Sequence, residues 1–94
     1  MPEYHRSDSF KEDYKELVKN DEAMERAIKK AFALFKENPN HPSLRVHPMQ
    51  GYDNVWEGHI SQKHVFTFSK ERNASGDLIY RFRRVGDHTI YKNP

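Results

Sequence analysis

The feature that most constrains the fold of this chain is an alternation of apolar and polar residues in its second half. It appears in three short runs, over residues 55–61, 64–69 and 78–85, and turn-forming residues separate the runs. Successive side chains of an extended strand point to opposite faces, so the alternation predicts three strands with one apolar and one polar face. Strands this close in sequence pair as antiparallel hairpins. A fourth strand is expected over residues 44–47, at an edge, because Pro48 cannot donate to a ladder.

The two faces of the predicted sheet differ sharply in chemistry. One face is mostly aromatic and carries Trp56, Ile60, Phe66, Phe68, Tyr80 and Phe82. Only 35% of the chain is hydrophobic, so these large side chains must supply much of the core. The other face carries Glu57, His59, Thr67, Arg81 and Arg83, and we expect it to be open to solvent.

The first part of the chain predicts two helices. A capping box at Ser9–Glu12 opens the first, and apolar residues then recur at helical spacing to Val18. Asp21 caps the second helix, which ends before Pro39. Joined this tightly, the helices form an antiparallel hairpin. The expected fold is a single α+β domain over residues 1–94, with the hairpin on the aromatic face. Residues 1–7 are either an edge strand or a loose arm.

Composition excludes several classes of site. The chain has no cysteine, so it forms no disulfide, has no thiolate nucleophile and cannot bind zinc through cysteine. It has no apolar run of membrane-spanning length and no signal-peptide core, so a cytoplasmic protein without a membrane partner is expected. Residues 43–94 carry 8 Lys and Arg against 5 Asp and Glu, whereas residues 1–42 carry 8 against 9. Attraction to phosphate must therefore come from the second half.

Four stretches occur in the order typical of one family: SFKEDYKEL, NPNHPSLRVHPMQG, VWEGHIS and RFRRVGDHTIYKNP. With these stretches the chain resembles the RelE/ParE superfamily of toxins from bacterial type II toxin–antitoxin systems. The resemblance implies a helical hairpin on one face of a twisted antiparallel sheet. It also implies a toxin that cuts mRNA on the ribosome and inhibits translation, that a cognate antitoxin holds inactive, and that meets operator DNA only through the antitoxin complex.

The histidine positions most resemble the YafQ branch of that family. The resemblance assigns proton transfer to His47, His59 and His88, with Glu57 as a weaker candidate for orienting a histidine. Metal-free RNA cleavage needs a base for the 2′-OH, an acid for the leaving oxygen and cations for the phosphate. Arg81 and Arg83 are expected to bind that phosphate, and Tyr91 and Tyr52 to stack on bases. No cofactor or metal is required.

Other interpretations remain open. A ParE-like toxin would poison DNA gyrase without cutting RNA, although that type generally lacks the histidines. An inactive homologue would only bind the antitoxin or DNA; Val65 favours this, because many members carry arginine there, and Lys63 stands where the YafQ branch has an acidic residue. A further alternative is that the histidines are ordinary surface residues. Three of them could bind zinc, but they lack the i, i+4 helical spacing that marks many zinc sites.

Overall fold

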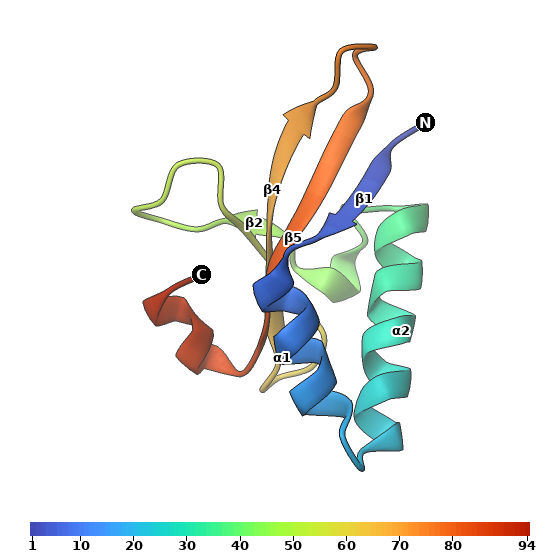
Figure 1. Cartoon of the computed structure of the whole chain (residues 1–94), viewed down its shortest axis with the longest axis vertical. Helices are drawn as coiled ribbons and strands as arrows, with labels where there is room; N and C mark the ends of the chain where they lie inside the picture. Colours follow the sequence, from blue (N-terminus) through green and yellow to red (C-terminus); the bar gives the residue numbers. More distant parts are fainter.

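The computed structural model describes residues 1–94 as a five-stranded sheet with two helices on one side. The helices are α1 (Asp8–Val18) and α2 (Glu22–Glu37). The strands run in the order β1-β5-β4-β3-β2, with bounds β1 (Glu3–Arg6), β2 (His47–Pro48), β3 (Trp56–His59), β4 (Val65–Arg72) and β5 (Leu78–Gly86). Figure 1 shows α2 to one side of the sheet, the C-terminal turn to the other, and α1 in front of the lower end of the long β4–β5 hairpin. The predicted α+β class and the helical layer are confirmed, and neither helix is long and apolar enough to span a membrane.

The N-terminal residues form an edge strand. β1 pairs with β5 in parallel, and Tyr4 is the register partner of Tyr80. The two rings stack with centroids 5.8 Å apart, which fixes this edge onto the core. Of the two alternatives left open for residues 1–7, the edge strand is the one found; it adds a parallel pair to an otherwise antiparallel sheet, because the first strand pairs with the last one rather than with a neighbour in sequence.

The helices begin at side-chain caps, one predicted and one not. Asp21 accepts from the backbone N–H of Met24 at 3.0 Å and starts α2, as expected. α1 begins at Ser7, whose hydroxyl oxygen accepts from the N–H of Phe10 at 3.0 Å, so the predicted capping box at Ser9 was wrong. The Ser7 hydroxyl also donates to the Arg83 carbonyl at 2.8 Å, and this tertiary contact selects the earlier serine.

The strand predicted over residues 44–47 is mostly absent. The 3-10 turn η1 (Pro42–Leu44) occupies this part of the chain, and Arg45 follows it with a left-handed backbone at φ 48°. Leu44 is 1% exposed and belongs to the core. The chain therefore turns at this point and buries Leu44 instead of continuing as an extended strand. Only His47 and Pro48 pair with β3.

The core is the aromatic face that the alternation predicted. The ring of Phe35 on α2 lies between 4.8 and 5.9 Å, centroid to centroid, from four aromatic rings of the sheet: Phe66, Phe68, Tyr80 and Phe82. Gly58 makes room for one of them, because a Cβ there would lie 2.3 Å from Cζ of Phe66. This glycine is therefore required by packing on β3.

The polar face is open at Arg81 and Arg83, as expected, but it is covered at two other positions. Glu57 is 4% exposed and Thr67 is fully buried, although both lie on the side away from the helices. The second 3-10 turn, η2 (His88–Lys92), folds back beside β5 and buries Ile90. A Cβ on Gly86 would lie 2.9 Å from the Ile90 side chain, so the turn approaches the strand closely. This one apolar residue of the tail helps convert part of the polar face into a covered site.

Candidate functional site

Two histidines and a buried carboxylate meet on the polar face. His47 and Glu57 are register partners across β2 and β3, and His59 lies two residues further along β3 on the same side. Oε1 of Glu57 lies 3.1 Å from Nε2 of His47 and 3.5 Å from Nε2 of His59. The Glu57 side chain is 5% exposed, whereas that of His47 is 52% exposed. The cluster thus has a buried carboxyl group and one imidazole in reach of a ligand.

The hydrogen bonds around His47 favour a ring that donates from both nitrogens. Nε2 faces the Glu57 carboxylate, and Nδ1 lies 3.1 Å from the carbonyl oxygen of Pro48. Both neighbours are acceptors, so an imidazolium satisfies both contacts and a neutral ring only one. His59 differs, because its Nδ1 is buried without a hydrogen-bond partner. The two histidines are therefore suited to different proton-transfer roles.

Tyr91 on η2 completes the cluster. Burial raises the pKa of its phenol above the ordinary value, and the neighbouring Glu57 carboxylate raises it further. The hydroxyl of Tyr52 donates to the backbone carbonyl of Tyr91 at 3.4 Å, which ties the β2–β3 loop to η2. Tyr91 is thus held as a protonated donor beside Glu57, in addition to offering a ring.

His88 lies at the start of η2 and is exposed. Its ring meets the ring of Tyr91 edge-on, with centroids 5.1 Å apart. We expected the His88 side chain to swing over the face towards His59 and Arg81. In the structure Tyr91 is the η2 residue that lies near Glu57, and His88 packs against the Tyr91 ring.

The two predicted phosphate-binding arginines lie on a different part of the polar face. Arg81 pairs with Glu71, and its register partner on β4 is Ser69 rather than Thr67, which faces Glu57. The register shift between β4 and β5 leaves Arg83 without a partner, and its Nε donates to the Pro94 carbonyl at 3.2 Å. Both arginines line a small cavity of about 140 Å³ near the end of β1.

Glu57 was the weakest of the catalytic residues predicted from the sequence. In the structure, however, the side chains of His47 and His59 converge on it. The signal was present in part, because Glu57 and His59 are two residues apart on a predicted strand and must share a face. His47 could not be placed, since β2 is only two residues long and its register comes from the folded sheet.

The same cluster has the geometry of a metal site. One ligand atom from each of His47, Glu57 and His59 lies within 4.8 Å of the other two. Two imidazoles and one carboxylate form a donor set that zinc and other divalent transition metals accept, with room for a further ligand. Proton transfer and metal binding would therefore compete for the same atoms.

Comparison with solved structures places the fold among bacterial toxins. The "YoeB/ParE toxin from Agrobacterium tumefaciens" superposes with a TM-score of 0.75, 17% identity and coverage of 92% of this chain and 98% of that chain. YafQ from Escherichia coli strain BL21(DE3) gives a TM-score of 0.74, 18% identity and coverage of 97% and 98%. A metal-bound toxin from Helicobacter pylori gives 0.70, 24% identity and coverage of 95% and 97%.

Neither the models of protein families nor the curated proteins match this sequence. At these identities the solved structures establish the fold alone. The chain thus has the fold of the YoeB/ParE and YafQ toxins, and the expected resemblance to the RelE/ParE superfamily is confirmed at that level.

Proposed function

We propose that this single-domain chain is the toxin of a type II toxin–antitoxin module and that it inhibits translation by cleaving mRNA on the ribosome. The observation that carries the proposal is the convergence of His47 and His59 on the buried Glu57 carboxylate. RNA cleavage through the 2′-OH needs a base and an acid within reach of one phosphodiester. The half-exposed His47 is the member best able to approach RNA, and Glu57 holds it in place.

The proton-transfer roles follow from the hydrogen bonds. His47, whose two nitrogens face acceptors, is suited to protonate the leaving 5′-oxygen. His59, with one nitrogen unpartnered, is suited to take the proton from the 2′-OH once RNA has displaced part of η2. Arg81 and Arg83 would bind a neighbouring phosphate of the same strand, while Tyr52 and the Tyr91 ring offer stacking surfaces and His88 adds a titratable group at the rim.

The test is ribosome-dependent cleavage, read by primer extension on an mRNA under translation. His47→Ala and His59→Ala should each lower the rate by about 10²–10⁴. His41→Ala is the control, because that histidine lies before η1 and accepts from the backbone N–H of Ser43. An active wild type with full activity in the His47 and His59 variants would reject the mechanism. Inhibition of DNA gyrase by a wild type that leaves mRNA intact would favour a ParE-like toxin.

The partner we propose is a small antitoxin that blocks the polar face and is acidic where it binds. The solved complex of DinJ with YafQ has the same fold on the toxin side, with a TM-score of 0.71 and 21% identity. Co-expression with the adjacent reading frame should yield a co-purifying complex and relieve growth arrest. An inactive homologue would co-purify in the same way and would leave growth normal when expressed alone.

A second candidate function is reversible metal binding at the same cluster. The three converging ligand atoms favour it, and the Helicobacter pylori toxin of the same fold was crystallised in a metal-bound form. A bound ion would occupy the nitrogens needed for proton transfer and would therefore inhibit cleavage. Calorimetric titration of the chain with Zn²⁺ and Cu²⁺ tests this, with His47→Ala abolishing the heat of binding. Cleavage should then rise on adding a chelator; a fall would indicate a catalytic ion.

A further inference from the structure

Residues 87–94 fold back beside the polar face and cover part of the histidine cluster. This segment, which we call the lid, consists of η2, the capping residue before it and two residues after it. Figure 1 shows it in red, leaving β5 and turning back beside the sheet. Glu57 is buried near Tyr91 of the lid, and the His59 side chain is only 20% exposed. RNA can therefore approach His47 directly, whereas full access to His59 requires the lid to move.

The lid is held by few interactions of its own. Its buried apolar side chains are Ile90, which packs close to Gly86, and Pro94. Backbone hydrogen bonds close its two ends, from the N–H of Ile90 to Asp87 at 3.2 Å and from the N–H of Asn93 to Ile90 at 3.0 Å. Hydrogen bonds of a 3-10 turn have poorer geometry than those of an α-helix. Short segments with little buried apolar surface open more readily than the core, so the lid is suited to open locally.

Two adjacent arginines of β5 clamp the end of the lid. Nε of Arg83 donates to the Pro94 carbonyl at 3.2 Å, and Nη1 of Arg84 donates to the Asn93 carbonyl at 3.1 Å. Neighbouring residues of a regular strand point to opposite faces. Here the register shift lets Arg84 pair with Thr67 and leaves Arg83 as the extra residue, and such an irregularity re-aims side chains. Both guanidinium groups can therefore reach the same segment.

The two arginines differ in how firmly they are held. Arg84 also binds both carboxylate oxygens of Asp13, through Nε at 2.6 Å and Nη2 at 3.1 Å, so its charge is neutralised and its position fixed. Arg83 has no carboxylate partner, and the Pro94 carbonyl is the one group of the protein to which its side chain donates. Arginine binds phosphate more strongly than a neutral carbonyl, because the bond is charge-assisted and the fork matches two oxygens. A phosphate on the polar face should therefore draw Arg83 away from the lid.

We propose that residues 87–94 keep the histidine cluster closed in the free protein, and that a phosphate of bound RNA opens this lid by taking Arg83 from the Pro94 carbonyl. The proposal rests on the proposed function in taking RNA as the ligand. It adds a regulatory step to that function, because His59 becomes accessible only when a strand already lies beside it. The free protein then keeps one of its two proton-transfer groups covered.

Amide hydrogen exchange of the ¹⁵N-labelled full chain measures lid opening without requiring cleavage. The reporters are the N–H groups of Ile90 and Asn93, and the reference is the N–H of Ser7, which bonds to a β5 carbonyl at 2.9 Å. Arg83→Gln should speed exchange at the reporters at least about tenfold, the effect of losing one hydrogen bond from a charged group, and leave Ser7 unchanged. Arg81→Gln removes the same charge from β5 without touching the lid, because Arg81 pairs with Glu71, and should leave the reporters as in wild type.

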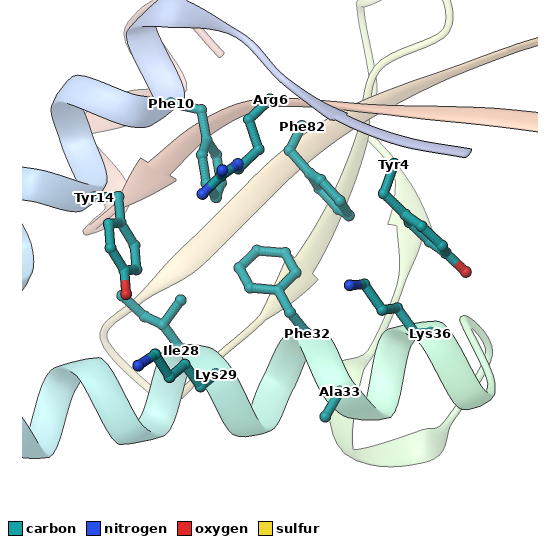
Figure 2. Close-up of a pocket in the computed structure, with 10 residues that line it drawn as sticks. All are labelled: Tyr4, Arg6, Phe10, Tyr14, Ile28, Lys29, Phe32, Ala33, Lys36 and Phe82. Atoms are coloured by element: carbon teal, nitrogen blue, oxygen red, sulfur yellow. The ribbon is translucent and has the colours of Figure 1, made fainter. Parts of the chain in front are cut away.

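Modification of histidines by diethyl pyrocarbonate gives a second readout, since peptide mapping reports each imidazole separately. Ile90→Ala removes the apolar anchor of the lid, so His59 should react at least about tenfold faster than in wild type. The exposed His5 should react equally in all variants. Lys29→Gln is the control, because it removes a positive charge on the helical side, where Figure 2 shows Lys29 lining a groove beside α2, and it should leave His59 at the wild-type rate.

The trigger is tested with a short single-stranded RNA that carries 2′-O-methyl groups and so cannot be cut through the 2′-OH. Added to wild type, it should speed exchange at Ile90 and Asn93 at least about tenfold, because the lid loses the same hydrogen bond as in Arg83→Gln. In Arg83→Gln it should give no further increase. Inorganic phosphate at the same phosphate concentration is the second arm, and equal opening by it would assign the trigger to free phosphate and overturn the role of RNA.

Several other results would overturn the proposal. These are reporter amides that exchange as slowly as Ser7 in every variant, equal effects of Arg81→Gln and Arg83→Gln, and an RNA that slows exchange in the lid. If Ser7 loses protection in Arg83→Gln, Tyr52→Phe takes its place, because it removes the hydrogen bond to the Tyr91 carbonyl and should speed exchange in the same direction.

Ribosome-dependent cleavage by the wild type, measured beside these experiments, separates this proposal from the proposed function. A lid that opens with RNA in a protein that cuts no mRNA would reject the nuclease and leave the lid in place. An active wild type whose lid does not respond to RNA would reject the lid and leave the nuclease.

Discussion

His47 and Glu57 face each other across the two-residue ladder of β2 and β3, and their side chains meet on it at 3.1 Å. A hydrogen bond to a charged group contributes about 1.5–3 kcal/mol, which corresponds to roughly tenfold to a hundredfold in rate if it is needed in the transition state. We therefore expect Glu57→Gln to lower ribosome-dependent cleavage by that factor. Glu71→Gln is the control, because Glu71 pairs with Arg81 away from the cluster. Unchanged cleavage in Glu57→Gln would remove this carboxylate from the mechanism.

The exposed His88 and the partly buried His64 should respond in opposite ways to replacement by alanine. His88 contacts the Tyr91 ring at the rim of the site, so His88→Ala should lower cleavage by less than the factor of about 10²–10⁴ expected for His47→Ala and His59→Ala. Its effect on the free energy of unfolding should be small. His64 closes the turn before β4, where its Nδ1 lies 3.4 Å from the hydroxyl of Ser61, so His64→Ala should lower stability more than rate. Primer extension and urea denaturation of both variants measure the two effects. Full cleavage by His88→Ala would leave this histidine outside the chemistry.

Substitutions at two neighbouring β4 residues on opposite faces should change the free energy of unfolding in opposite directions. Phe66 is fully buried among the aromatic rings, so Phe66→Ala should cost about 3–5 kcal/mol of stability. Thr67 was expected to be exposed and tolerant, yet it is fully buried with a hydroxyl that has no partner. Thr67→Val keeps the shape and removes that hydroxyl, so it should stabilise the protein by about 1 kcal/mol or more. Urea denaturation decides both, and a destabilised Thr67→Val would mean that the hydroxyl has a partner.

Asp87 should make the stability of the chain fall in acid. Hydrogen bonds from the hydroxyl and the N–H of Thr89 lower the pKa of Asp87 below its ordinary value. A carboxyl with a depressed folded pKa contributes stability above the unfolded pKa of about 3.9 and loses it as pH falls through the folded pKa. The advantage of wild type over Asp87→Asn in urea denaturation should therefore shrink below about pH 4. Asp53→Asn, in the exposed β2–β3 loop, serves as the control, and a gap for Asp87 that is constant with pH would contradict the assignment.

Placing an arginine at Val65 should harm the protein. The family resemblance implies arginine at the matching position in many members, so Val65→Arg tests whether this chain accepts it. Val65 is fully buried and is the register partner of His59, so a guanidinium there would have to be buried beside the cluster or would displace its cover. We expect a large loss of stability and no gain in cleavage. A stable Val65→Arg variant that cleaves mRNA faster than wild type would contradict this expectation and would show that η2 can move to accommodate the arginine.

The parts of the fold that were predictable are those with local signals. Alternation around Phe66 and Phe82 identified the aromatic face, and Asp21 marked the start of α2, because both depend on residues close in sequence. The pairing of β1 and the cover over Glu57 were not predictable, since each depends on a contact made between distant parts of the folded chain. The candidate site divides in the same way. Glu57 and His59 share a strand, whereas the approach of Tyr91 required the fold of η2.

The parallel pairing of β1 with β5 also bears on when the protein becomes active. Glu3 is paired with Ile79, so the first strand must wait for the last one to be synthesised before the sheet can close. Contacts between such distant segments form late and slow folding. Tyr91 follows later still, after β5 has ended. The site proposed to attack ribosomes therefore assembles only after β5 and η2 have been synthesised, which leaves an interval in which a partner already present can bind first.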